Sequence, residues 1–121
     1  MSAAIKIIRQ GYGDVFAKAG KKMEADRSLG FRVDITAEDL PAVRGVESYN
    51  AFRGEDVADV LAKIIHDHVA YTVSFGREGS PVVYVWVKSD QDRNTVLSLL
   101  KEVGPDELDV VGNNTIRAWW D

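Results

Sequence analysis

His66 and His68 are the only histidines in the sequence, and they are the side chains best suited to metal binding or to proton transfer near neutral pH. An H-x-H pair points both rings to one face in a strand, but about 200° apart in a helix. Because the preceding apolar spacing predicts a helix, the pair binds a metal only if that helix has already ended. A polar helix C-terminus is the simpler interpretation, and we expect no metal and no cofactor.

General base catalysis by His66 with Asp59 or Asp67 is a further hypothesis, but the sequence offers no matching nucleophile. A phosphate-binding turn at Gly11-Tyr12-Gly13 is also incomplete, because the third glycine of G-x-G-x-x-G falls at Phe16. The sequence contains no G-x-S-x-G, no H-E-x-x-H, no EF-hand loop and no cysteine. These patterns favour a protein that is not an enzyme.

Aromatic and cationic residues alternate along two predicted strands near the C-terminal end. Tyr84, Trp86 and Lys88 share one face of the first strand, and Arg117 and Trp119 share a face of the second. Aromatic planes beside cations bind flat ligands or the bases of single-stranded nucleic acid. Tyr84, Trp86, Lys88 and Arg117 are therefore a candidate ligand-binding set, unless a predicted N-terminal helix covers this face.

Arginine and aromatic residues in predicted loops and at the chain end form a second candidate set, for binding another protein, because these residue types carry much of the energy of interfaces. The set consists of Arg44, Tyr49, Arg53, Arg77, Glu78 and Trp119. Adjacent side chains of a strand point to opposite faces, so Trp119 and Trp120 are both buried only if both faces are covered. One of the two rings is therefore a candidate anchor for a partner.

Composition and charge narrow the classes of protein. The chain has 121 residues, of which 45% are hydrophobic, and this suits one domain with a core of its own. The lack of cysteine fits a reducing compartment, and no run approaches the roughly 18 apolar residues of a membrane span. With no signal-peptide pattern at the N-terminus, we expect a soluble, cytoplasmic protein.

The net charge of −4 is unevenly distributed, with +2 on residues 1–54 and −6 on residues 55–121. An acidic C-terminal part favours a partner with a basic surface and makes nucleic acid an unlikely one, since phosphate contacts require cations.

These residues must be positioned by a predicted helix-hairpin-helix unit over residues 54–104, around which the remaining elements pack. Apolar spacings of three and four predict helices over Glu55 to His68 and Asp90 to Val103. Two β-rich runs between them are joined by a turn rich in Gly and Pro, and Gly104-Pro105 ends the second helix. The strands are predicted over Ala70 to Phe75 and Val82 to Val87.

Flanking segments complete the predicted fold. The N-terminal stretch Ala3 to Arg27 has the spacing of an amphipathic helix with a break at Gly11 to Gly13, although residues 4–9 also suit a strand. The other predictions are a strand over 31–36, a helical turn over 37–40, a strand over 43–48, and a C-terminal hairpin of 108–111 and 115–120 turning at Gly112-Asn113-Asn114.

These elements predict an α+β fold, a two- or three-layer sandwich with a mainly antiparallel sheet. Residues 43–120 also match the ferredoxin-like order of strand, helix, strand, strand, helix, strand. Within one domain the chain divides into 1–36, 54–104 and 107–120. In the central hairpin, one face is expected to be apolar and the other mixed; the apolar face comprises Tyr71, Val73, Phe75, Val83, Val85 and Val87, and the other Thr72, Ser74, Tyr84, Trp86 and Lys88.

Together these patterns suggest a small acidic protein of the inhibitor, immunity or adaptor type, which binds and covers a macromolecular partner. It would act as a monomer or as a homodimer formed through an edge strand. The alternative is binding of a small molecule or single-stranded nucleic acid at the aromatic sheet face. A small enzyme that uses His66 with a carboxylate is the third hypothesis.

Overall fold

The computed structural model describes residues 31–46, 48 and 50–121. The predicted N-terminal helix over 3–27, its alternative strand over 4–9, and Tyr49 lie outside the described residues. The elements, in chain order, are β1 (Phe31–Ile35), the 3₁₀ turn η2 (Ala37–Asp39), α3 (Leu40–Arg44), α4 (Gly54–His66), β2 (Ala70–Arg77), β3 (Pro81–Val87), α5 (Asp90–Lys101), β4 (Glu107–Val110) and β5 (Thr115–Trp119).

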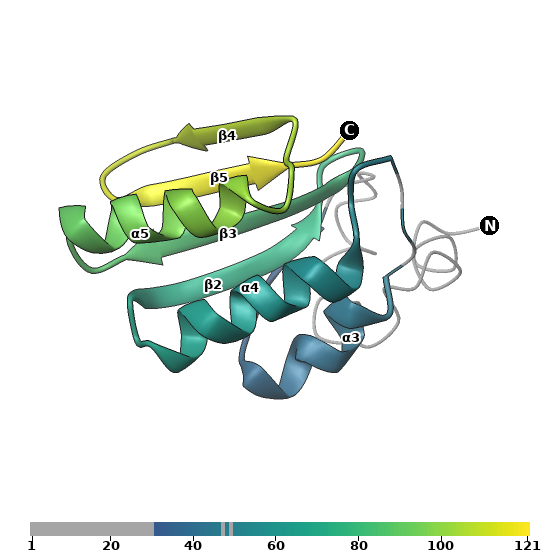
Figure 1. The fold of residues 1–121 in the computed structure, drawn as a ribbon, viewed down its shortest axis with the longest axis horizontal. Coiled ribbons are helices and arrows are strands. Elements are labelled where there is room, and N and C mark those ends of the chain that lie inside the picture. Colours follow the sequence, from purple (N-terminus) through teal and green to yellow (C-terminus); the bar gives the residue numbers. More distant parts are fainter. Residues whose placement is uncertain (1–30, 47, 49) are drawn as a thin grey trace.

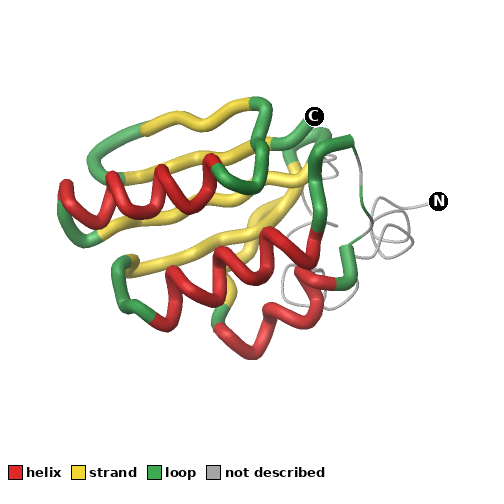
Figure 2. Tube along the Cα trace, viewed as in Figure 1, coloured by secondary structure: helices red, strands yellow, loops and turns green. Residues whose placement is uncertain are grey.

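The described strands form one antiparallel sheet in the order β1-β2-β3-β5-β4. Helices α4 and α5 lie across the same face of this sheet, and α3 packs beside α4 (Figures 1 and 2). This arrangement confirms the predicted α+β class with an antiparallel sheet.

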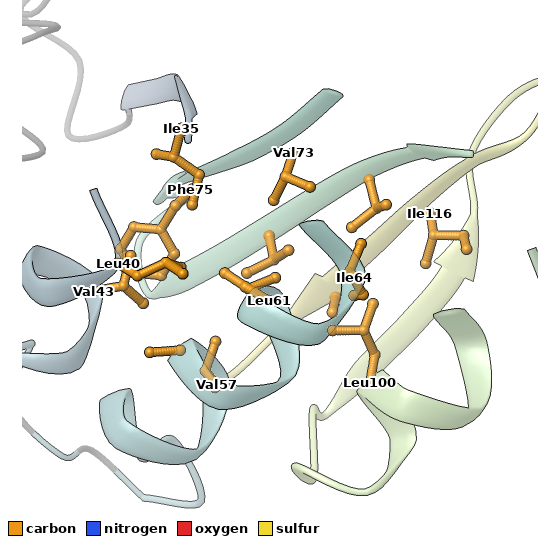
Figure 3. Close-up of a cluster of buried hydrophobic side chains, with 14 of the residues drawn as sticks. Ile35, Leu40, Val43, Val57, Leu61, Ile64, Val73, Phe75, Leu100 and Ile116 are labelled. Carbon is orange, nitrogen blue, oxygen red and sulfur yellow. The ribbon is translucent and has the colours of Figure 1, made fainter. Parts of the chain in front are cut away.

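Both long helices follow the apolar spacing of the sequence. Val57, Leu61 and Ile64 of α4 are buried, as are Val96 and Leu100 of α5. Figure 3 shows the labelled side chains of this set pointing into the layer between the helices and the sheet. The burial of these apolar side chains is the main stabilising contribution of the two helices.

Local signals set where α4 and α5 begin and end. Ser89 caps α5 by accepting a hydrogen bond from the Asp92 amide at 3.1 Å. Gly104 follows α5 with a φ of 67°, as expected for a left-handed helix end. Helix α4 ends at His66, two residues earlier than predicted, and His68 adopts a positive φ of 55°.

The strand predicted over residues 43–48 is wrong, because Leu40–Arg44 is the helix α3. Thr36 and Asp39 form the predicted capping interaction, in which the Thr36 amide donates to Asp39 Oδ2 at 2.7 Å. Pro41 lies in the first turn of α3, where the missing N–H costs nothing, so the helical turn continues through it. The ferredoxin-like order is also wrong, since it requires a strand at 43–48 and the first strand is instead β1, at the sheet edge.

The two faces of the central hairpin are as predicted, except at Tyr71 and at Lys88, which follows the end of β3. Val73 lies opposite Val85 and Phe75 opposite Val83 on the helix-covered face. A register shift between Ala70 and Thr72 interrupts the alternation, and Tyr71 is consequently 75% exposed instead of being part of the apolar face.

Within the described residues, no helix combines the length and apolar composition needed to cross a membrane.

Candidate functional site: the outer sheet face and its acidic margin

The candidate site lies on the sheet face opposite α4 and α5, called here the outer face. Antiparallel pairing places Arg117 opposite Tyr84 and Trp119 opposite Val82. Since directly paired residues share a face, Arg117 and Trp119 lie on the Tyr84 side of the sheet. The register therefore decides a question that the sequence leaves open. Each described strand contributes to this face: Arg32, Asp34, Thr72, Ser74, Val82, Tyr84, Trp86, Glu107, Asp109, Thr115, Arg117 and Trp119.

Glu78, in the loop between β2 and β3, is hydrogen-bonded to side chains of β3 and β5 on this face. Its Oε1 accepts from Arg117 Nε at 2.9 Å, and its Oε2 accepts from the Tyr84 hydroxyl at 2.6 Å. Its backbone carbonyl accepts from Trp119 Nε1 at 2.9 Å. The guanidinium of Arg117 also donates through Nη1 to Glu107 of β4 at 2.7 Å. Residues from the two predicted sets thus form one network.

The network fixes the charge of Arg117. Its partial burial would by itself lower the pKa, but hydrogen bonds to Glu107 and Glu78 outweigh this cost and raise the pKa above its ordinary value. Arg117 therefore neutralises charge on two carboxylates at once.

Tyr84 supplies a test of the network. Burial, followed by its hydrogen bond to Glu78, raises the pKa of the Tyr84 phenol above its ordinary value. The neutral phenol is the donor, so its stabilising contribution is complete below about pH 10 and is lost as the pH rises through the raised pKa. An ultraviolet titration should therefore show a late-ionising tyrosine.

Tyr84→Phe should remove that late step, with the folded state followed by circular dichroism in parallel. Tyr71→Phe, at an exposed ring, is the matched control and should retain the step. A late step that persists in Tyr84→Phe would assign it to another tyrosine and contradict the described hydrogen bond.

The centre of the outer face is largely buried. Tyr84 and Trp86 are half-buried and stacked, with ring centroids 6.0 Å apart, and the Arg32 guanidinium lies 4.3 Å from the Tyr84 centroid. Ser74 and Val82 are fully buried on the same face, and the Ser74 hydroxyl donates to Asp34 at 2.6 Å. A flat ligand would have to displace Arg32 from the aromatic pair. The fourth residue of the predicted ligand set, Lys88, lies apart from this centre, 5.6 Å from the Tyr71 ring.

Of the other described members of the predicted partner set, Arg44 and Arg53 form their contacts elsewhere, and Arg77 lies beside Glu78 without joining its network. Arg44 on α3 forms a salt bridge with Asp59 on α4 at 2.8 Å, on the helix side of the sheet. Arg53 precedes α4 and donates to the carbonyl of Phe52 at 2.8 Å, which is a local structural role. Arg77, at the end of β2, donates from Nε to the Gly79 carbonyl at 3.2 Å within the β2–β3 turn.

His66 lies at an exposed position, beside only one of the two carboxylates that the sequence suggested as its catalytic partners. Its side chain is 88% exposed, and its Nδ1 lies 3.2 Å from Oδ1 of Asp67. Hydrogen bonds from His66 and Lys63 hold the pKa of the Asp67 carboxyl below its ordinary value. Asp59, the other predicted partner of His66, is bound by Arg44. The described part of the chain holds no cluster of three or more His, Cys, Asp or Glu side chains arranged to bind a metal.

The margin of the outer face at β4 is acidic and partly apolar. Glu107 and Asp109 lie on its outer side, and Asp109 forms no salt bridge with any described residue. Asp106 adjoins them, where its Oδ2 accepts from the Asp121 amide at 2.8 Å. Val110 and Val111 at the end of β4 are 45% and 48% exposed. We call this set, Asp106 to Val111, the acidic margin.

Sequence reasoning missed Arg32, Glu107 and Asp109 as members of this region. Their place depends on which strand pairs with which: β1 brings Arg32 to Tyr84, and β4 brings Glu107 to Arg117. The alternation of Glu107, Asp109 and Val111 with Leu108 and Val110 was the one available signal for the margin. No family model matches this chain, and no curated protein or solved structure matches it either.

Proposed function

We propose that this chain is a non-catalytic protein that binds a macromolecular partner with a basic surface through its acidic margin. The observation that carries the proposal is the combination of exposed carboxylates with two exposed valines along β4 and the residue that follows it, at the edge of the sheet. Charged groups attract and orient a partner, and the apolar side chains gain from being covered.

The distribution of charge favours the acidic margin, and not the centre of the outer face, as the binding site. Arg117 and Arg32 are engaged by Glu78 and by the aromatic pair, so the cations of this face are held inside it. Asp109 retains an uncompensated negative charge among the described residues, and the C-terminal part of the chain carries −6 in total. A basic partner would complement both features.

Trp119 lies between the acidic margin and the Glu78 network: it is paired with Glu107 of β4 and donates to the Glu78 carbonyl. Its ring is half-buried and so remains partly accessible to a partner. In this proposal it is the aromatic anchor at the inner border of the contact, whereas Trp120 belongs to the core.

The test is a selection of ligands from a random peptide library against the folded protein, followed by titration of the selected peptides. The selected peptides should be rich in Lys and Arg and should bind more weakly at high salt. Asp109→Lys should weaken binding by about tenfold. Asp56→Lys changes the net charge equally but lies in α4, on the helix side, and should leave the affinity within about twofold.

Equal losses for both variants would show that only net charge matters and would contradict a defined binding margin. Peptides selected without basic residues would contradict the proposed partner. A parallel titration with nucleotides and oligonucleotides examines the alternative, and binding that is lost in Trp86→Phe but retained in Asp109→Lys would favour ligand binding at Tyr84 and Trp86.

A further inference from the structure

Strand β4 is an edge of the sheet, with β5 on one side and no described strand on the other (Figure 1). An edge strand carries backbone N–H and C=O groups that another extended chain is able to pair with. Charged residues protect many edges, but β4 combines carboxylates with the exposed Val110, and the exposed Val111 follows the strand directly.

The hydrogen bonds to β5 show which backbone groups of β4 face outward. The Val111 amide donates to the Thr115 carbonyl at 2.8 Å, and Trp119 O accepts from Asp106 N at 2.9 Å. In an antiparallel ladder the residues alternate between facing the partner strand and facing away. Given the pairing of Asp109 with Arg117, residues 107, 109 and 111 face β5. The backbone groups of Leu108 and Val110 therefore face the open edge.

The side chains of β4 specify what an added strand must carry. Glu107 and Asp109 lie on the outer face, while Leu108 and Val110 lie on the helix side, opposite Ala118 and Ile116. Directly opposed residues of neighbouring strands share a face, and opposite charges in such pairs are favourable. An added strand would thus place Lys or Arg beside the two carboxylates and apolar side chains beside Leu108 and Val110.

A second copy of this chain fits the edge poorly. In the twofold antiparallel registers that pair Leu108 of one β4 with Leu108 or Val110 of the other, and so pair most of the strand, Glu107 or Asp109 of one copy lies opposite Glu107 or Asp109 of the other. Like charges in directly opposed positions are destabilising. The charge pattern thus selects a different, basic chain over a homodimer through this edge.

We propose that β4 binds an extended segment of a partner protein, in which Lys or Arg alternates with apolar residues, by adding that segment as a strand to the sheet. This inference rests on the proposed function and assigns the contact to the backbone of Leu108 and Val110. Because β4 has four residues, the matching segment is short, and pairing with Val111 would extend it by one position.

The probe is the peptide acetyl-Lys-Val-Lys-Val-Lys-Val-Lys-amide, added to the full-length ¹⁵N-labelled protein. Its control is a block peptide of the same composition, with four Lys followed by three Val, which cannot place all its lysines on one strand face. We expect the alternating peptide to slow amide exchange at Leu108 and Val110, and to bind about tenfold more tightly than the block peptide.

Val110→Pro removes one outward-facing amide and should abolish binding, because an edge strand tolerates proline while an added strand cannot pair with it. Val110→Ala keeps the amide and should retain most of the affinity. If the proline variant fails to fold, Asp109→Lys provides the second variant and should reduce binding of the alternating peptide.

Equal affinity of the two peptides, or binding without slower exchange at Leu108 and Val110, would overturn strand addition. Binding that instead perturbs Glu78 and Trp119 would overturn the inference while leaving the proposed function standing. Absence of binding by either peptide would contradict both. A concentration-dependent dimer with slowed exchange at these same amides would replace the basic partner with a second copy.

Discussion

Trp120→Ala is expected to destabilise the protein by about 3–5 kcal/mol. Trp120 is fully buried, and its ring packs edge to face against Phe52 with centroids 5.3 Å apart. Its Nε1 donates to the Val103 carbonyl at 2.9 Å, just after α5. The substitution therefore leaves a large cavity and a partly buried carbonyl without its donor.

Urea unfolding followed by circular dichroism measures this loss. Trp119→Ala is the matched control, since this ring is half-buried on the outer face and donates to the Glu78 carbonyl. Its loss of stability should be clearly smaller, and its main effect should be on partner binding. Equal losses of stability for the two variants would contradict the different roles of the adjacent tryptophans.

Gly54→Ala is expected to destabilise the protein by about 2–3 kcal/mol. A Cβ atom at Gly54 would lie 2.6 Å from the Val43 carbonyl oxygen and 2.8 Å from that of Val46. These are backbone atoms at the end of α3 and beyond it, so one of the segments must move. The sign of the change in stability is informative, because alanine in a helix is otherwise more stable than glycine by about 1 kcal/mol.

Gly45→Ala is the matched control, because its added Cβ would lie 3.6 Å from the nearest described atoms, an ordinary contact. Its φ of −84° suits any residue, so its stability should remain within about 0.5 kcal/mol of the original. Thermal or urea unfolding of the two variants compares them directly. Unchanged or increased stability in Gly54→Ala would contradict the close approach of α3 and α4.

The elements that bury a regular apolar pattern could be predicted from the sequence. The spacing of Val57, Leu61 and Ile64 fixes the buried side of α4, and Gly112 and Asn114 adopt the positive φ expected in the C-terminal turn. Such patterns are local, so a single chain segment is enough to reveal them.

The wrong predictions arose where local patterns were ambiguous or tertiary geometry decided. Val43 and Val46 suit a strand, but Leu40 and Val43 are also three residues apart and form the buried side of α3, and Val46 is buried just after that helix ends. The exposure of Tyr71 depends on a register shift between Ala70 and Thr72 that no residue type in this segment predicts.

The site was predicted only in part for the same reason. Tyr84, Arg117, Glu78 and Trp119 were recognised by residue type, but in two separate sets. These four side chains come together in one network because β3 pairs with β5 and because of where the β2–β3 turn lies. Long-range pairing of this kind is set by the whole fold, which spacing along one strand does not reveal.

The most direct test of partner binding at the acidic margin is site-specific photo-cross-linking in cells that naturally produce the protein. A photoreactive residue at position 111, beside the carboxylates of β4, is compared with one at position 56 on α4. We predict a discrete adduct with a basic protein from position 111, abolished by Asp109→Lys, and no such adduct from position 56. Adducts of equal yield from both positions, or none from position 111, would contradict the account.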